Sequence, residues 1–124
     1  MSTKQIVPVI LVVEDEAFIR LSAVCMLEDA GFRMIEAANG DDALELLEVD
    51  SDVQLLFTDV TMPGTMDGLG LARRVRERWP HIGIMVASAK QAPRPDEMPP
   101  GARFEQKPYG PDTVVRHARE LTLV

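Results

Sequence analysis

The chain has 124 residues, with 13 Lys and Arg against 20 Asp and Glu, and a formal net charge of −7. This length suits a single domain covering 1–124, and 46% hydrophobic residues are too many for a disordered acidic tail. The negative charge argues against direct DNA binding, and the single cysteine excludes the disulfide-stapled secreted proteins. The longest apolar run, 6–13, is too short to span a bilayer and lacks a signal-peptide cleavage site, so we expect no membrane insertion and a cytoplasmic protein.

The first half of the chain alternates strand and helix patterns. An apolar, β-branched run at 7–13 stops at three acidic residues and predicts a strand buried on both faces. Apolar residues at helical spacing predict a helix over 17–30. A weaker strand is expected at 32–37, and a second helix at 39–49, which Asn39 would cap.

The second half continues the alternation. Strands are predicted at 53–58 and 82–87, with a helix at 69–79 between them that Pro80 ends. A short strand at 102–105 and a last helix beginning at Pro111 follow. Strands that alternate with helices need crossover connections, so the pattern predicts an α/β fold, a doubly wound five-stranded parallel sheet covered on both faces.

The segment 89–100 breaks this regularity. It contains four prolines within eight residues, Pro93, Pro95, Pro99 and Pro100, and proline inside a helix costs about 3 kcal/mol. We therefore expect residues 90–100 to form no more than a turn or two of helix.

Chemically active side chains follow four of the predicted strands. Glu14 and Asp15 follow the first, Asp59 the third, Ser88 the fourth and Lys107 the fifth. In an open parallel sheet, ligands bind outside the carboxyl ends of the strands. Each residue taken singly has an ordinary alternative: acidic residues at a helix N-terminus, turn residues, or a surface lysine. Their common position at one sheet edge favours a site.

Clustered carboxylates need a cation nearby. At about 4 Å and an effective dielectric near 20, two of them repel by about 4 kcal/mol. Lys107 and a hard divalent ion such as Mg²⁺ are the candidates. With a phosphoryl ligand each residue has a role: Asp59 attacks phosphorus, and Lys107, Ser88 and Mg²⁺ hold the peripheral oxygens.

Five motifs now make a resemblance specific: VVEDE at 12–16, FTDVTMPG at 57–64, MDG at 66–68, VASA at 86–89 and KPY at 107–109. In order and spacing they resemble the response-regulator receiver domain of bacterial two-component systems, in its single-domain, chemotaxis-regulator-like form. The resemblance covers about residues 7–122.

The resemblance implies a flavodoxin-like sheet of order 2-1-3-4-5 and transfer of a phosphoryl group from a sensor histidine kinase or phosphotransfer protein to Asp59. It also implies that Asp15 and Asp59 ligate Mg²⁺ directly, that the Thr61 carbonyl is a third ligand and that Glu14 acts through water. The Lys107-Pro108 bond is expected to be cis.

The family's conformational switch implies two further roles. Ser88 would be the hydroxyl that the phosphoryl group recruits, and Phe104 the aromatic that moves in response. For Phe104, an ordinary core phenylalanine is the alternative.

The sequence departs from the family in two places. The loop 62–68 is one residue longer than usual, which should reshape the mouth of the site without moving Asp59. Residues 89–100 replace the family's fourth helix with a shortened or irregular segment, which puts the usual signalling face in doubt. Elsewhere, we expect Cys25 to fill the core and His81 and His117 to be surface residues.

The leading hypothesis is a stand-alone receiver that is phosphorylated on Asp59 and changes conformation to signal to a downstream protein target. It would assist its own phosphorylation and dephosphorylation but not be a dedicated enzyme. A homodimer and a receiver excised from a hybrid kinase both stay open.

The alternatives are a Mg²⁺-dependent phosphohydrolase or mutase with an aspartyl-phosphate intermediate, and a pseudo-receiver that binds partners without phosphorylation. Val60 and Thr61 offer no second acid or base for the first, and no core site residue is missing as the second would require.

Overall fold

In the computed structural model, which describes residues 7–50 and 52–122, five strands form one parallel sheet. The strands are β1 (Val9–Val13), β2 (Arg33–Ala37), β3 (Val53–Asp59), β4 (Gly83–Ser88) and β5 (Arg103–Gln106). Their order is β2-β1-β3-β4-β5, which confirms the expected flavodoxin-like topology.

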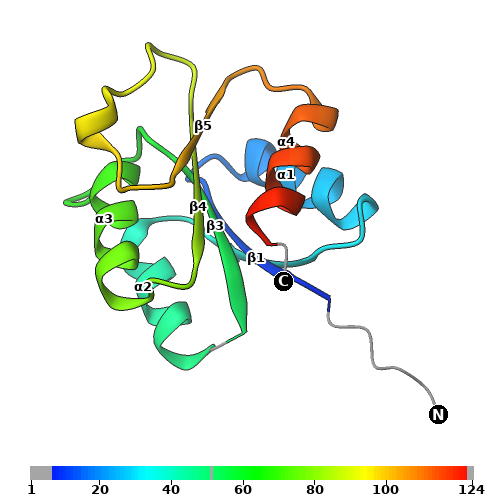
Figure 1. Cartoon of the computed structure of the whole chain (residues 1–124), viewed down its shortest axis with the longest axis horizontal. Helices are drawn as coiled ribbons and strands as arrows, with labels where there is room; N and C mark the ends of the chain where they lie inside the picture. Colours follow the sequence, from blue (N-terminus) through cyan, green and yellow to red (C-terminus); the bar gives the residue numbers. More distant parts are fainter. Residues whose placement is uncertain (1–6, 51, 123–124) are drawn as a thin grey trace.

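Helices cover both faces of the sheet (Figure 1). The helices α1 (Ala17–Asp29) and α4 (Pro111–Leu121) lie on one face, and α2 (Gly40–Val49) and α3 (Gly68–Arg78) on the other. None of the helices within 7–50 and 52–122 is long and apolar enough to cross a membrane.

The interior strand β1 contributes side chains to both apolar layers of the core. All of its residues are buried, as the apolar run predicted. Ile10 and Val12 pack with the apolar residues of α1 and α4. Val9, Leu11 and Val13 pack with those of α2 and α3. Because side chains alternate along a strand, one short sequence supports both layers and holds its carboxyl end rigidly at the sheet edge.

Local capping fixes two helix starts near that edge. The Asn39 side chain accepts a hydrogen bond from the Asp42 N–H at 2.8 Å, and the Asp67 side chain accepts one from the Gly70 N–H at 2.8 Å. These bonds satisfy donors that the first helical turn leaves free.

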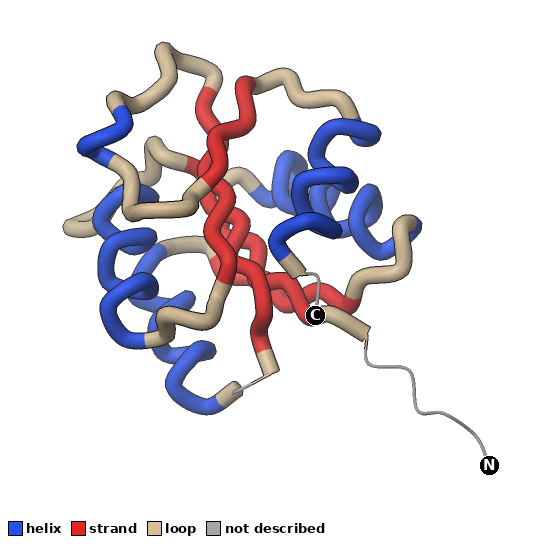
Figure 2. Tube along the Cα trace, viewed as in Figure 1, coloured by secondary structure: helices blue, strands red, loops and turns tan. Residues whose placement is uncertain are grey.

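The proline-rich segment between β4 and β5 contains one short 3₁₀-helix, Pro95–Glu97, which confirms the expectation for 90–100 (Figure 2). Pro99 is buried, and Met98 packs against the core on the α3 side. The Arg73 guanidinium donates to the Glu97 carbonyl at 3.0 Å and so fastens the segment to α3.

Two sequence expectations were wrong. Cys25 is exposed, because Ala23, Val24 and Leu27 are the residues of α1 that turn toward the sheet. His117 is no simple surface residue: its Nδ1 lies 2.7 Å from Oε2 of Glu105, a carboxylate on β5 that is 3% exposed. Helical periodicity shows that a helix has an apolar face, but α1 is apolar around much of its surface, so the pattern could not identify which residues are buried.

Candidate functional site

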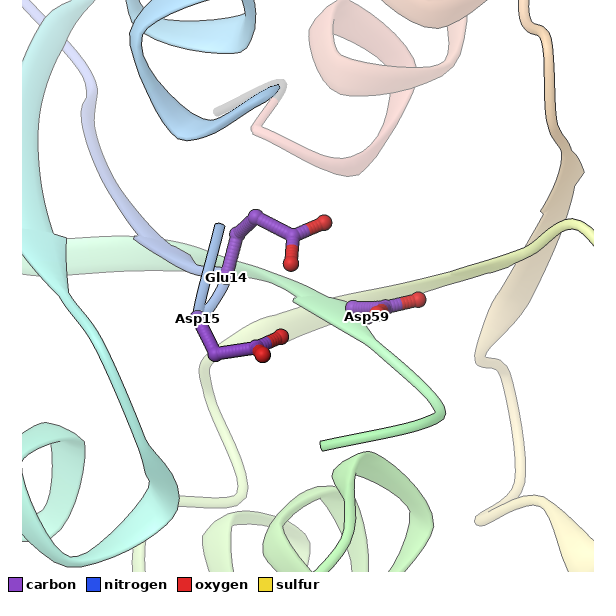
Figure 3. A group of neighbouring side chains, drawn as sticks. All are labelled: Glu14, Asp15 and Asp59. Carbon is purple, nitrogen blue, oxygen red and sulfur yellow. The ribbon is translucent and has the colours of Figure 1, made fainter. Parts of the chain in front are cut away.

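Three carboxylates meet at the carboxyl edge of the sheet, as the strand ends predicted (Figure 3). Glu14 and Asp15 follow β1, and Asp59 is the last residue of β3. Because Val13 pairs with Thr58 in register, the two strand ends lie side by side. One oxygen from each of the three carboxylates lies within 4.8 Å of the others. Glu14 is buried, Asp59 is half-buried and Asp15 is exposed.

Lys107 provides the positive charge beside this cluster. Its Nζ lies 2.8 Å from Oε1 of Glu14 and 3.2 Å from Oδ1 of Asp59. The residue directly follows β5, and its N–H donates to the Ser88 carbonyl at 2.8 Å, which fixes the strand end. The Lys107-Pro108 peptide bond is cis, as expected. The ammonium is therefore held between a buried acid and the predicted phosphoacceptor.

Burial and charge shift two pKa values in this cluster. Desolvation by burial raises the pKa of Glu14, and the hydrogen bonds from Lys107 and from the Glu16 N–H oppose it only in part. Burial lowers the pKa of Lys107, but the hydrogen bond to Glu14 and the charges of Asp59 and Glu14 outweigh it and raise the pKa above its ordinary value. The lysine therefore stays protonated at neutral pH and compensates part of the acidic charge.

The remaining predicted residues lie around the same edge. Ser88 is buried at the end of β4, where its Oγ accepts a hydrogen bond from the Lys90 N–H at 3.0 Å. Thr61 is exposed, two residues beyond Asp59. Phe104 lies on β5 opposite Val86, half-buried against the core on the α3 side. Ser88 and Phe104 thus belong to adjacent strands. Ser88 lies at the sheet edge, whereas Phe104 lies in the apolar layer and outside the carboxylate cluster.

Tyr109 is a residue near the site to which sequence reasoning gave no role. It lines a cavity of about 10 Å³ together with Glu14, Asp59 and Lys107, and its ring centroid lies 5.6 Å from that of Phe57. Burial raises the pKa of Tyr109, and the charges of Glu14 and Asp59 raise it further, against the opposing effect of Lys107. The sequence feature that could have identified Tyr109 as a site residue is its position directly after Lys107-Pro108.

Gly68 is a second residue to which the sequence gave a motif but no role. Its N–H donates to the Val60 carbonyl at 2.8 Å. A Cβ at this position would lie 1.8 Å from the main-chain oxygen of Asp59. Only glycine therefore allows α3 to begin directly against the end of β3, and this contact sets the position of the Asp59 backbone.

The arrangement suits a hard divalent cation and a phosphoryl group. Carboxylate oxygens are the ligands that Mg²⁺ prefers, and one or two of them usually suffice beside phosphate oxygens. Asp59 can serve both as ligand and as nucleophile, while the lysine ammonium can neutralise a transferred anion.

Comparison with known proteins agrees with this geometry. A family model described as the response regulator receiver domain matches residues 10–99. The response regulator receiver protein CpdR of Brucella abortus is 39% identical over 90% of this chain and 88% of its own length. The sensor kinase CckA of the same organism is 33% identical over 90% of this chain, which spans 12% of the kinase. Relatives therefore include both a short receiver protein and a much longer kinase.

Solved structures extend the likeness to the whole fold. A response regulator receiver protein from Sinorhizobium medicae superposes with a TM-score of 0.88 and 26% identity, over 94% of each chain. The response regulator TrrA from Thermotoga maritima, solved in complex with Mg(2+)-BeF, gives a TM-score of 0.81 and 26% identity over 92% of this chain and 98% of its own. From its fold, its acidic cluster and these matches together, the chain belongs to the response regulator receiver domain family of two-component systems.

Proposed function

We propose that this chain accepts a phosphoryl group on Asp59 from the phosphohistidine of a sensor histidine kinase or phosphotransfer protein, and then signals to a downstream protein. The observation that carries the proposal is the placement of Asp59: its carboxylate faces the Lys107 ammonium at 3.2 Å and shares the sheet edge with Glu14 and Asp15. Receiver domains interact with histidine kinases or phosphotransfer proteins, which supports the donor class.

The transfer step exchanges one bond for another. A carboxylate oxygen of Asp59 attacks phosphorus, a P–O bond forms, and the P–N bond to the donor imidazole breaks with its electron pair returning to the ring. Lys107 moves its hydrogen bonds from the carboxylates to a peripheral phosphoryl oxygen, and the Ser88 hydroxyl turns from the Lys90 N–H to another. Asp59 thereby becomes an acyl phosphate.

Asp15 and Asp59 would hold Mg²⁺ directly, with Glu14 acting through water and the Thr61 carbonyl as a further ligand. The three carboxylates each offer an oxygen within 4.8 Å of the others, and this oxygen donor set fits the ion. Lys107 is the cation that contacts two of them, Glu14 and Asp59, in this structure. When bound, Mg²⁺ supplies neutralisation of the phosphoryl oxygens. The Mg(2+)-BeF complex of the similar TrrA supports the same site in this chain.

We propose a phosphoacceptor and not a dedicated enzyme. Val60 and Thr61, which follow Asp59, provide no second acid or base for hydrolysing a separate substrate. The cavity that Asp59 and Lys107 line measures about 10 Å³, room for one water molecule at most. A half-buried nucleophile at the sheet edge, with a side chain that is 12% exposed, suits transfer from a group that a partner protein brings to this edge.

The output is proposed to pass through β4 and β5. Ser88 is buried at the end of β4 and Phe104 lies on the neighbouring strand, so a hydroxyl that turns toward the phosphoryl group would alter the packing between them. The segment 89–102 joins these strands, and its Met98 packs in the same apolar layer as Phe104. We propose that this segment takes the place of the family's fourth helix in contacting the downstream protein.

The function is tested by incubating the purified chain with a small phosphodonor and Mg²⁺ and measuring its intact mass. Wild type should gain one phosphoryl group, and Asp59→Asn none. Asp112→Asn is a matched control that should behave as wild type, because Asp112 lies on α4, outside the cluster. Equal labelling of wild type and Asp59→Asn would reject the proposal.

A further inference from the structure

Arg20 contacts the main chain at the acidic edge of the sheet. It lies in the first turns of α1, and its Nη1 donates to the main-chain carbonyl oxygen of Glu14 at 2.7 Å. Its Nε lies 3.1 Å from Oε1 of Glu36, on the neighbouring edge strand β2. The Arg20 side chain is 20% exposed, whereas that of Glu36 is 48% exposed. One guanidinium therefore makes two contacts, one of them to the peptide group that joins Glu14 to Asp15.

Lys107 holds the Glu14 side chain of the loop that Arg20 contacts, but the main chain of this loop has few other bonds among the described residues. Residues 14–16 connect β1 to α1, and the sheet reaches them through one bond, from the Glu14 N–H to the Ala37 carbonyl at 3.1 Å. Glu16, the N-cap of α1, makes no side-chain capping bond. Its N–H instead donates to Oε2 of Glu14 at 3.2 Å. The direction of the Asp15 side chain therefore depends on an uncapped loop, which the Arg20 bond restrains.

Two consequences of this arginine oppose each other. A positive charge near a cation site repels the ion, so through-space electrostatics alone would make Arg20 weaken Mg²⁺ binding. A charge-assisted hydrogen bond that fixes the ligand loop strengthens binding, because the site then loses less conformational freedom when the ion enters. Whether loss of Arg20 strengthens or weakens Mg²⁺ binding therefore distinguishes charge repulsion from positioning.

We propose that Arg20 is a positioning residue for the Mg²⁺ site, acting through the Glu14 carbonyl, and that positioning outweighs charge repulsion. The inference rests on the proposed function of the cluster. It assigns the ion pair with Glu36 a minor part, because the Glu36 side chain is half exposed and ion pairs that water screens contribute little.

Three variants test the inference: Arg20→Ala, Arg20→Lys and, as matched control, Glu36→Ala. Glu36→Ala removes the ion pair and leaves the bond to Glu14. Mg²⁺ binding is titrated by calorimetry without any phosphodonor, and melting temperatures are recorded in metal-free buffer. Arg20→Ala should weaken Mg²⁺ binding about tenfold, as loss of a group that orients a ligand typically does. Arg20→Lys should lie between, because one ammonium can still reach the carbonyl.

The control separates positioning from edge-strand stability. Glu36→Ala should bind Mg²⁺ as wild type does. Unchanged or tighter Mg²⁺ binding by Arg20→Ala overturns the inference, as does an equal loss in Glu36→Ala. If Arg20→Ala does not fold, Arg20→Lys decides in the same way. A wild type that binds no Mg²⁺ would instead overturn the metal site itself, together with this inference; a wild type that binds normally while Arg20→Ala is unaffected leaves the proposed function intact.

Discussion

Lys107 Nζ lies 2.8 Å from Oε1 of Glu14, a contact between residues 93 positions apart in the chain. The pair joins the residue that follows β5 to the residue that follows β1, at the two sides of Asp59. Because the Glu14 side chain is 5% exposed and that of Lys107 is 17% exposed, water screens the pair only partly. The ammonium is the charge that makes a metal-free acidic cluster tolerable.

Replacing Lys107 by Met should therefore lower the stability of the metal-free protein by about 1–3 kcal/mol, since a buried carboxylate loses its partner. The same variant should show a larger rise in melting temperature with Mg²⁺ than wild type, because the ion then relieves more repulsion. Thermal melts with and without Mg²⁺ measure both effects. Lys90→Met, at an exposed lysine beyond β4, is the control and should change neither.

Gly68→Ala should impair the site through the backbone of Asp59. The added Cβ would lie 1.8 Å from the Asp59 oxygen, so β3 or α3 must shift, at a cost of about 1–3 kcal/mol. Weaker Mg²⁺ binding should accompany the loss of stability. Gly70→Ala is the control, because its Cβ would meet only side-chain atoms, at 3.3 Å and beyond. Normal Mg²⁺ binding by a folded Gly68→Ala protein would contradict the role of this contact.

Tyr109 should titrate above its ordinary pKa of 10.0 in the folded protein, because burial and the charges of Glu14 and Asp59 disfavour the phenolate. It is the chain's single tyrosine, so absorbance at the phenolate band reports it alone. In denaturant the midpoint should return to the ordinary value. Equal midpoints in the two states would show that the hydroxyl is not buried beside the site.

The same shift of the Tyr109 pKa has a consequence for stability. A pKa that is higher in the folded state contributes stability that is fully present below the unfolded value of 10.0 and lost as the pH rises through the folded value. Lys107, whose pKa is also raised, acts in the same direction above 10.5. Wild type should thus lose stability above pH 10.0, and Tyr109→Phe should lose less; denaturant unfolding at several pH values measures the difference.

The pair of Glu105 and His117 should contribute to the docking of α4 on β5. Among the described residues, His117 makes the only side-chain hydrogen bonds to Glu105, at 2.7 and 3.0 Å. His117→Ala leaves a buried acid without a partner and should destabilise the fold by about 1–3 kcal/mol. Adding Glu105→Leu should recover most of that loss. His81→Ala, at an exposed position, should be neutral; a similar loss there would argue against a specific pair.

Local sequence pattern predicted the parallel α/β sheet and the members of the cluster, and the motif resemblance supplied the strand order. Strand periodicity places Glu14, Asp15, Asp59 and Lys107 after their strands, and parallel topology then brings them together. The roles of Arg20 and Gly68 were not predicted, because they depend on contacts across the fold. Arg20 contacts Glu36 on β2, and Gly68 lies against the backbone of Asp59. Burial of Glu105 and exposure of Cys25 escaped for a similar reason, since packing of a whole layer decides them.

The most direct test of the central proposal locates the phosphoryl group itself. Phosphorylated protein is treated with borohydride, which reduces an acyl phosphate to an alcohol and converts the aspartate that carried it to homoserine. Peptide mass spectrometry then reads the modified position. We expect homoserine at Asp59 alone, and only when the phosphodonor and Mg²⁺ were both present. Homoserine at Asp15 or at another aspartate, with Asp59 unmodified, would contradict the assignment of Asp59 as the phosphoacceptor.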